Sequence, residues 1–151
     1  MVEDLHRRRV LNFLDAYYSG DAEAAMACCD DDFDSIAHAP IELFPHLGHQ
    51  RGKDWVAEMI RTQQQRYSSR SYEIKFMAVD GARVATIQQI NLRKRNDNRV
   101  VQVEAAEFYT LRGGRILVHR SFFDSFDLVQ QLLGQDLTAA FAASVRDAMR
   151  R

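Results

Sequence analysis

Two acidic residues and one histidine are the strongest candidates for chemistry in this sequence. Glu107 lies in the run 100–111, where strand neighbours alternate between two faces and the odd-numbered face is the more apolar one. A carboxyl group on such a face is desolvated, so we expect its pKa to rise and its protonated form to donate a hydrogen bond to an oxyanion. The alternatives are a buried glutamate paired with an arginine and a glutamate at a dimer interface.

Asp124 and His38 are the other candidates for moving protons. Asp124 follows the run 115–123 at the corner between a strand and a helix, where the alternative role is to cap the helix. His38 lies near the end of a strand predicted for 33–39. Histidine is a competent base near neutral pH in general. A histidine at the surface or at the rim of a cavity is the alternative.

Neutral polar and aromatic side chains are candidates for holding a substrate. Gln89 and Asn91 lie two residues apart, and therefore on one face of the strand predicted for 83–93. Their amides can hold a water or a carbonyl group, but they cannot serve as a general acid. Ordinary solvent-facing amides are the alternative. The aromatic residues that we expect around an apolar pocket, unless they are simply core, are Tyr17, Tyr18, Phe44, Trp55, Phe122 and Phe123.

A metal site has weak support. His46, His49 and His119 are spread over a loop and a strand, with no helical pair four residues apart and no cysteine nearby. The three adjacent acids 30–32 favour a solvated turn, because no further ligands follow at the spacing of a cation-binding loop. We therefore expect neither a metal nor a cofactor.

The hydrophobic pattern predicts helices first and long strands afterwards. Apolar residues at helical spacing predict helices over 3–19 and 22–29 and from about 53 to 67. The period then changes to two. The strands predicted from it are 71–79, 83–93, 100–111 and 115–123. Two short helices, predicted for 126–133 and 137–149, end the chain.

This order of elements favours an α+β fold. Short turns around Gly81, 96–98 and Gly113 join consecutive strands, which predicts an antiparallel meander. A curved antiparallel sheet wrapped around N-terminal helices makes a cone-shaped α+β barrel with an apolar cavity, and such cavities are ligand sites by default. We expect a single domain over residues 1–151, with 135–151 as a C-terminal helical extension.

Charge and hydropathy exclude several classes of partner. The 151 residues carry 20 basic and 21 acidic side chains, so no strong field attracts nucleic acid or anionic lipid. No apolar run approaches the about 20 residues that a membrane span needs, and the N-terminus does not resemble a secretory signal. Cys28 and Cys29 are adjacent and do not form an ordinary structural disulfide, which is typical of a reduced, cytoplasmic protein.

Three stretches of the chain resemble the nuclear transport factor 2-like superfamily, and within it the SnoaL-like and limonene-epoxide-hydrolase-like branch. They are FLDAYYSGD at 13–21, GKDWV at 52–56, and 113–124 with the leucines that follow as far as Gly134. The resemblance covers nearly the whole chain to Gly134. It is specific for the fold, which hosts isomerases, cyclases, hydrolases, dehydratases and non-catalytic binding or assembly domains.

The resemblance also implies roles for particular residues. Asp124 stands where the epoxide hydrolases have the base that activates water, and Glu107 falls near the hydrogen-bond-donating acid of ketosteroid isomerase. Gln89 and Asn91 stand where the epoxide hydrolases have Arg and Asp. His38 falls near the proton-abstracting Asp of the isomerase. These departures argue against epoxide hydrolysis and steroid isomerisation as those enzymes perform them.

The sequence therefore predicts a small-molecule pocket protein. Our first hypothesis is cofactor-free acid–base chemistry on an apolar, oxygenated metabolite, of the isomerase, cyclase, hydrolase or dehydratase type. The alternative is a non-catalytic ligand-binding protein or a dimeric assembly domain of the same fold. The even-numbered face of 100–111 carries Gln102, Glu104 and Phe108, which is too mixed for a core. We expect a symmetric homodimer through this face of the sheet.

Overall fold

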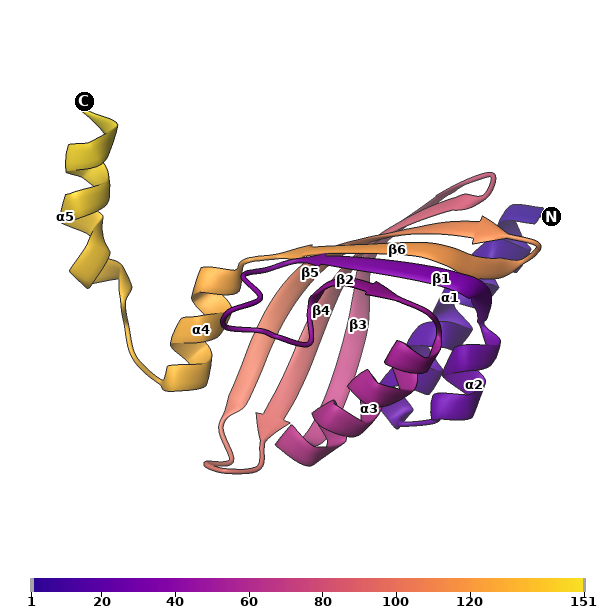
Figure 1. Cartoon of the computed structure of the whole chain (residues 1–151), viewed down its shortest axis with the longest axis horizontal. Helices are drawn as coiled ribbons and strands as arrows, with labels where there is room; N and C mark the ends of the chain where they lie inside the picture. The colour runs from indigo at the N-terminus through magenta and orange to yellow at the C-terminus, as the bar shows by residue number, and fades with distance from the viewer. Residues whose placement is uncertain (1, 151) are drawn as a thin grey trace.

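The computed structural model describes residues 2–150, which form five helices and six strands. Figure 1 shows their arrangement. In chain order they are α1 (Val2–Ser19), α2 (Ala22–Ala27), β1 (Cys29–His38), β2 (Gly48–Arg51), α3 (Asp54–Arg66), β3 (Tyr67–Asp80), β4 (Arg83–Lys94), β5 (Val100–Arg112), β6 (Arg115–Phe123), α4 (Ser125–Leu133) and α5 (Thr138–Met149).

The strands form one open, curved, mixed sheet in the order β2-β1-β6-β5-β4-β3. Strands β3 to β6 make the predicted antiparallel meander. The predicted fold class is confirmed with one difference: the sheet is mixed, because β1 lies parallel to β6, with Ser35 opposite His119 and Ala37 opposite Ser121. The direction of β1 follows from α3, which carries the chain back beneath the sheet before the meander begins (Figure 1).

Two further local predictions need correction near β1. Residues 30–32, predicted as a turn, belong to β1, where its pairing with β6 is irregular. Their carboxylates form ion pairs with two surface cations, Arg112 and Lys53, and those of Asp31 and Asp32 remain exposed to solvent, as expected. The loop predicted for 41–51 ends in the four-residue strand β2, which pairs antiparallel with β1.

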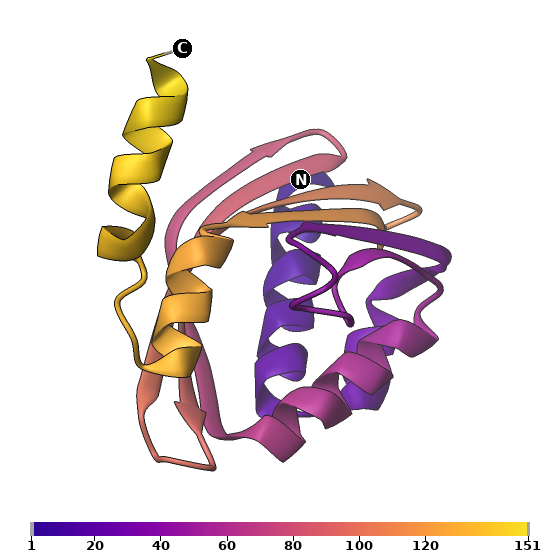
Figure 2. The same ribbon diagram turned by 60° about the vertical axis from the view of Figure 1, so that its left-hand side comes forward.

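Helices α1, α2 and α3 cover the concave face of the sheet (Figures 1 and 2). Each helix turns its apolar residues, spaced three and four apart, toward the strands, and their burial supplies most of the stabilisation of the fold. The buried side chains of this core include Val10, Phe13 and Leu14 of α1, Val56 and Ile60 of α3, and Val84, Tyr109, Leu111 and Ile116 of the sheet.

Alternation along β5 decides which side chains face the helices. The buried residues of β5 are odd-numbered and include Glu107 and Tyr109, whereas Phe108 between them is 47% exposed on the convex face. The predicted inward position of Glu107 is therefore confirmed.

The last two helices leave the sheet at its end. Helix α4 begins after Asp124 and ends at Gly134, whose left-handed conformation (φ 68°) terminates the helix. Helix α5 stands away from the sheet in both ribbon views, and none of its residues is buried. Within residues 2–150, no helix has the length and apolar character that crossing a membrane requires.

Candidate functional site

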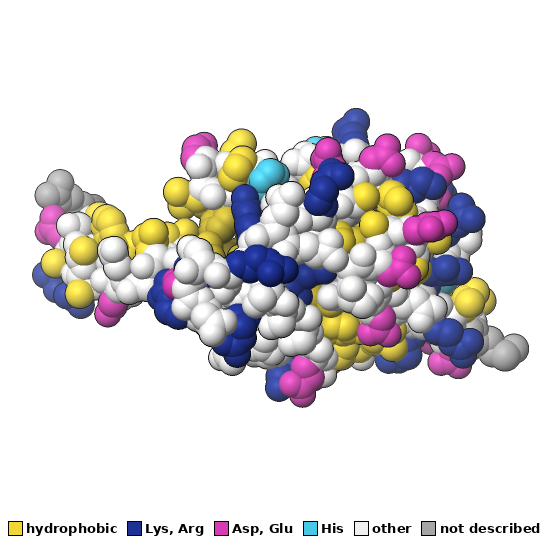
Figure 3. Space-filling model, turned by 90° about the horizontal axis from the view of Figure 1, so that it is seen from below, with side chains coloured by type: hydrophobic (Ala, Val, Ile, Leu, Met, Phe, Trp, Pro, Cys, Tyr) yellow, Lys and Arg dark blue, Asp and Glu magenta, His cyan; other side chains and the backbone are white. Residues whose placement is uncertain are grey.

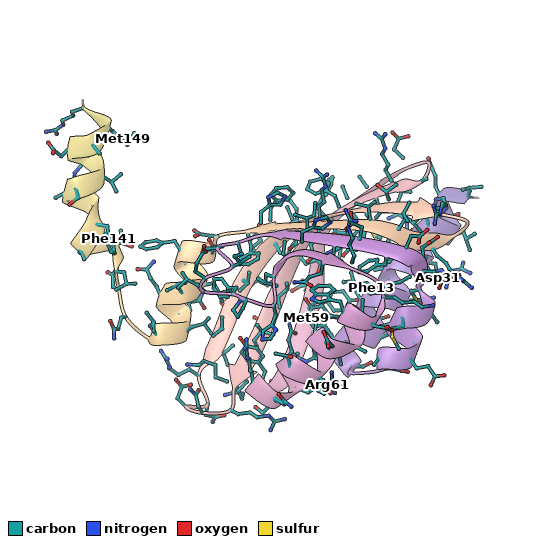
Figure 4. The ribbon with its side chains drawn as sticks, viewed as in Figure 1. Phe13, Asp31, Met59, Arg61, Phe141 and Met149 are labelled. Atoms are coloured by element: carbon teal, nitrogen blue, oxygen red, sulfur yellow. The ribbon has the colours of Figure 1, made fainter. Side chains whose placement is uncertain are left out.

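An apolar cavity of about 180 Å³ lies between the concave face of the sheet and helices α1 and α3. Figure 4 labels two of its lining residues, Phe13 on α1 and Met59 on α3, both beneath the sheet. The apolar and aromatic part of the lining includes Phe13, Leu14, Tyr17, Tyr18, Phe44, Trp55, Met59, Ile90, Leu92, Val103, Phe123, Leu128 and Leu132. Such a lining binds an apolar ligand, and the few polar groups in it fix the ligand's orientation.

Glu107 is the one acidic residue among the described residues that line this cavity. Its Oε2 atom accepts hydrogen bonds from Gln88 Nε2 at 2.9 Å and from the Tyr109 hydroxyl at 2.7 Å. His119 Nε2 lies 3.3 Å from the same oxygen. Within residues 2–150 no hydrogen bond reaches Oε1, and the side chain keeps 12% of its surface exposed. One carboxylate oxygen is therefore held by the protein, and the other is available to a ligand.

The electrostatics around Glu107 favour its charged form. Burial alone raises the pKa of this carboxyl. Electrostatic attraction to His119, with the hydrogen bonds from Tyr109 and Gln88, outweighs burial and lowers the pKa to about 2. The raised pKa expected from the apolar neighbours in β5 was wrong, because the donors include residues of β4 and β6. Glu107 accepts hydrogen bonds at neutral pH and does not donate them.

His119 connects Glu107 to a buried hydroxyl. Its Nδ1 lies 2.9 Å from Ser35 Oγ, while its Nε2 faces the carboxylate. A hydroxyl, an imidazole and a carboxylate thus follow one another across β1, β6 and β5. Ser35 is only 1% exposed and does not line the cavity, so it positions the imidazole and is not placed to attack a ligand. The hydroxyl of Ser121, opposite Glu107 in the sheet, does reach the cavity.

Two phenols from α1 supply hydrogen-bond donors to the cavity. Tyr17 and Tyr18 both line it, and their rings meet edge to face with centroids 5.1 Å apart. Burial raises the pKa of both phenols, and the negative charge of Glu107 raises it further. Both hydroxyls therefore stay protonated at neutral pH and can donate to an oxygen atom of a ligand.

Six of the residues predicted for the site line the cavity, namely Glu107, Tyr17, Tyr18, Phe44, Trp55 and Phe123. The expectation for Phe122 was wrong, because its side chain is exposed outside the cavity. The indole of Trp55 donates to the His46 carbonyl oxygen at 3.1 Å, which fixes the ring at the loop that precedes β2.

Asp124 and His38 lie elsewhere. Asp124 is exposed, and its carboxylate accepts a hydrogen bond from the Asp127 amide at 2.9 Å, which makes it the N-cap of α4. His38 is exposed on the convex face, where its ring stacks on Phe122 with centroids 4.2 Å apart. Asp124 is therefore a helix cap and His38 is a surface histidine, which are the alternative roles given above for these two residues.

The prediction for Gln89 and Asn91 is also corrected. The buried face of β4 carries the even-numbered residues, including Gln88 and Ile90, and Gln89 and Asn91 lie on the opposite face. The sequence does not show which of the adjacent residues Gln88 and Gln89 faces the cavity, because a glutamine at either position fits the alternating pattern.

Sequence reasoning missed Gln88, His119 and Ser121 as neighbours of Glu107. In β6 the pairing with β5 shifts register near 116–118. Ile116, an even-numbered residue, faces the core before the shift, and odd-numbered residues face the cavity after it. A β-bulge of this kind reverses the apparent alternation and leaves no recognisable signal in the sequence. Within residues 2–150, no three His, Cys, Asp or Glu side chains lie close enough together to hold a metal ion.

A curved mixed sheet packed on three N-terminal helices is the architecture of the nuclear transport factor 2-like fold. The SnoaL-like domain model matches residues 10–119, and the chain belongs to this family. Members of this fold include isomerases, cyclases and epoxide hydrolases.

Solved structures agree with this assignment. A putative isomerase from Rhodopseudomonas palustris is 27% identical, with a TM-score of 0.76 over 89% of this chain and 100% of that chain. An LEH-like epoxide hydrolase from M. tuberculosis is 24% identical, with a TM-score of 0.72 over 93% and 98%. A putative SnoaL-like polyketide cyclase from Jannaschia sp. CCS1 is 14% identical, with a TM-score of 0.73 over 86% and 92%. A search of curated proteins finds no match.

Proposed function

We propose that this protein binds a small, largely apolar, oxygenated molecule and that Glu107 accepts a proton from it without a cofactor. The observation that carries the proposal is the asymmetry of the carboxylate. Gln88, Tyr109 and His119 all approach Oε2, which leaves Oε1 for the ligand. The solved relatives described as an isomerase, an epoxide hydrolase and a polyketide cyclase support chemistry of this class.

Removal of a proton leaves negative charge on the ligand, and a hydrogen-bond donor is required to stabilise that charge. When Oε1 takes a proton from a carbon next to a carbonyl group, negative charge develops on the carbonyl oxygen. A hydrogen bond from Tyr17 or Tyr18 stabilises that charge, because both phenols remain protonated in the buried cavity. Returning the proton to another carbon isomerises the ligand, and returning it to the same carbon leaves the ligand unchanged.

Proton exchange on a simple ketone tests this proposal. 2-Tetralone carries an acidic carbon–hydrogen bond next to its carbonyl group, and proton NMR in deuterium oxide follows its exchange. We expect the protein to accelerate exchange and Glu107→Gln to reduce the enzymatic rate at least about 100-fold, as loss of a general base does. Glu104→Gln is the control, because Glu104 lies on the same strand with its side chain exposed on the convex face. Exchange that is no faster than in buffer, or that survives Glu107→Gln, contradicts the proposal.

Ligand binding without turnover is the second candidate function. The low pKa of Glu107 favours it, because a carboxylate with a pKa of about 2 is a weak base at neutral pH. In this case Oε1 anchors a hydroxyl group of the ligand. Binding of 2-naphthol that Glu107→Gln weakens, with no deuterium entering 2-tetralone, selects this function over the first.

A further inference from the structure

A second set of polar side chains lines the cavity at its opposite end. Thr62, Gln63 and Arg66 belong to the last turns of α3, and all three line the cavity. Arg66 is exposed, whereas Glu107 is only 9% exposed. The cavity therefore has an inner end that accepts hydrogen bonds and an outer end that donates them.

Arg70 determines which atoms of Gln63 face a ligand. Its guanidinium donates to Gln63 Oε1 at 3.1 Å and to the Tyr17 carbonyl oxygen at 3.0 Å, tying α3 to α1. With Oε1 engaged, the amide NH₂ is the group that Gln63 can offer. In residues 2–150 the side chains of Thr62 and Arg66 form no hydrogen bond and no ion pair. The Thr62 hydroxyl, the Gln63 amide NH₂ and the Arg66 guanidinium can therefore all donate to an acceptor group of a ligand.

The charge at this end is positive. The β4–β5 turn adds Arg95, which donates from Nε to the Gln64 carbonyl oxygen at 2.9 Å and from its amide to the Arg66 carbonyl oxygen at 2.9 Å. The C-terminus of a helix carries about half a negative charge. The positive charges of Arg66, Arg70 and Arg95 together exceed it. Figure 3 shows Lys and Arg side chains across the middle of the face seen from below, on the side of the helices.

We propose that this outer end is a subsite for a carboxylate of the ligand, bound by Arg66 together with Gln63 and Thr62. The inference rests on the proposed function for the placement of the ligand's body in the cavity. The orientation follows from charge, since anionic Glu107 repels a carboxylate and Arg66 attracts it. A cavity of about 180 Å³ fits one or two rings, because about 150 Å³ fits benzene. The ligand class is thus a hydroxylated ring compound with a carboxylate at the far end.

Three naphthalene probes test the subsite in the full-length protein. They are 6-hydroxy-2-naphthoic acid, its methyl ester, and 2-naphthoic acid, with affinities measured by calorimetry. We expect the hydroxy acid to bind about tenfold tighter than the ester, which corresponds to about 1.4 kcal/mol. Arg66→Gln should remove this preference and leave the ester's affinity unchanged. Arg61→Gln should preserve it, because Arg61 is exposed on the same helix and does not line the cavity.

The results separate the subsite from the proposed function. Equal affinities of acid and ester for the unsubstituted protein, or equal losses with Arg61→Gln and Arg66→Gln, overturn the subsite. Glu107→Gln should remove the advantage of the hydroxy acid over 2-naphthoic acid and keep the preference for acid over ester. If the advantage of the hydroxyl group survives Glu107→Gln, the role of Glu107 fails and the subsite stands. If no probe binds the unsubstituted protein, both proposals fail.

Discussion

Glu107 keeps its charge in a buried position because two hydrogen-bond donors and the imidazole of His119 surround one of its oxygens. A buried carboxylate without partners takes up a proton, since desolvation penalises the ionised form. Here His119, Tyr109 and Gln88 come from β6, β5 and β4 and offset that penalty. The remaining oxygen stays a strong acceptor beside a largely apolar cavity.

The pKa of Glu107 should depend on His119 more than on any other side chain. His119→Gln removes the electrostatic attraction of the imidazole and leaves burial less opposed, so we expect the pKa of Glu107 to rise. Carbon NMR titration of the labelled carboxyl group measures it. Arg120→Gln is the control, because Arg120 lies exposed on the other face of the same strand. A pKa that stays low in the His119 variant contradicts this explanation.

Ionisation of Glu107 should also stabilise the fold over a defined pH range. Its folded pKa of about 2 lies below the ordinary value of 4.5, so the stabilisation is complete above about 4.5 and is lost as the pH falls toward 2. Glu107→Gln should lack this contribution. Urea unfolding of both proteins at pH 6 and pH 2.5 measures the difference in free energy of unfolding, which should shrink at the lower pH. A difference that grows on acidification contradicts the direction of the pKa shift.

The sequence predicts the place of Glu107 but not its surroundings. Alternation is regular through β5, so the inward face of Glu107 could be read from its neighbours. His119 could not be placed because the register shift in β6 moves it to the cavity face. The direction of the pKa shift was wrong for the same reason, since pKa depends on side chains that only the assembled sheet brings together.

At the scale of elements, the corner between β6 and α4 shows how a capping residue resembles a catalytic one. Asp124 directly follows β6, at the position where the resemblance to the epoxide hydrolases led us to expect a catalytic acid. Its carboxylate instead satisfies a free amide of the first helical turn.

Substituting Asp124 should change stability and leave the cavity unaffected. Asp124→Ala should lower the free energy of unfolding by about 1 kcal/mol, or the melting temperature by about 2–4 °C, because α4 loses its N-cap. Asp124→Ser should restore most of that stability, since serine is also a good cap. Thermal unfolding and the affinity for 2-naphthol measure the two properties. Loss of affinity in both variants at unchanged stability restores Asp124 as a site residue.

The elements predicted well are those with a sustained period. The helices α1 and α3 and the strands β4 and β5 extend over enough residues for their apolar pattern to decide the type. Strand β2 has four residues and alternates too briefly to be recognised. The parallel partner of β1 is not encoded in any local pattern, because it depends on how α3 crosses the sheet.

At the scale of the whole molecule, the convex face of the sheet remains unpartnered. Phe76, Phe108 and Phe122 expose between 40% and 51% of their surfaces there. The rings of Phe108 and Phe122 meet edge to face with centroids 5.9 Å apart. We propose that a second copy of the chain covers this face in a two-fold dimer, because contiguous exposed aromatic residues mark interaction sites.

A charge on the convex face should dissociate that dimer. Phe108→Glu should give a monomer at micromolar concentration in sedimentation velocity, where we expect the unsubstituted protein to sediment as a dimer. Phe141→Glu is the control, because Phe141 is equally exposed but lies on α5. A monomeric unsubstituted protein refutes the dimer, and dissociation by Phe141→Glu alone moves the interface to α5.

The parallel pairing of β1 with β6 determines when the site can assemble during synthesis. Ser35 and His119 are 84 residues apart in the chain, yet they share a hydrogen bond in the floor of the site. A ribosome must complete β6 before this pair can form, although α1, α2 and α3 are already free to fold. Until then the emerging polypeptide exposes the apolar lining of its cavity, so we expect it to depend on chaperones until β6 has been synthesised.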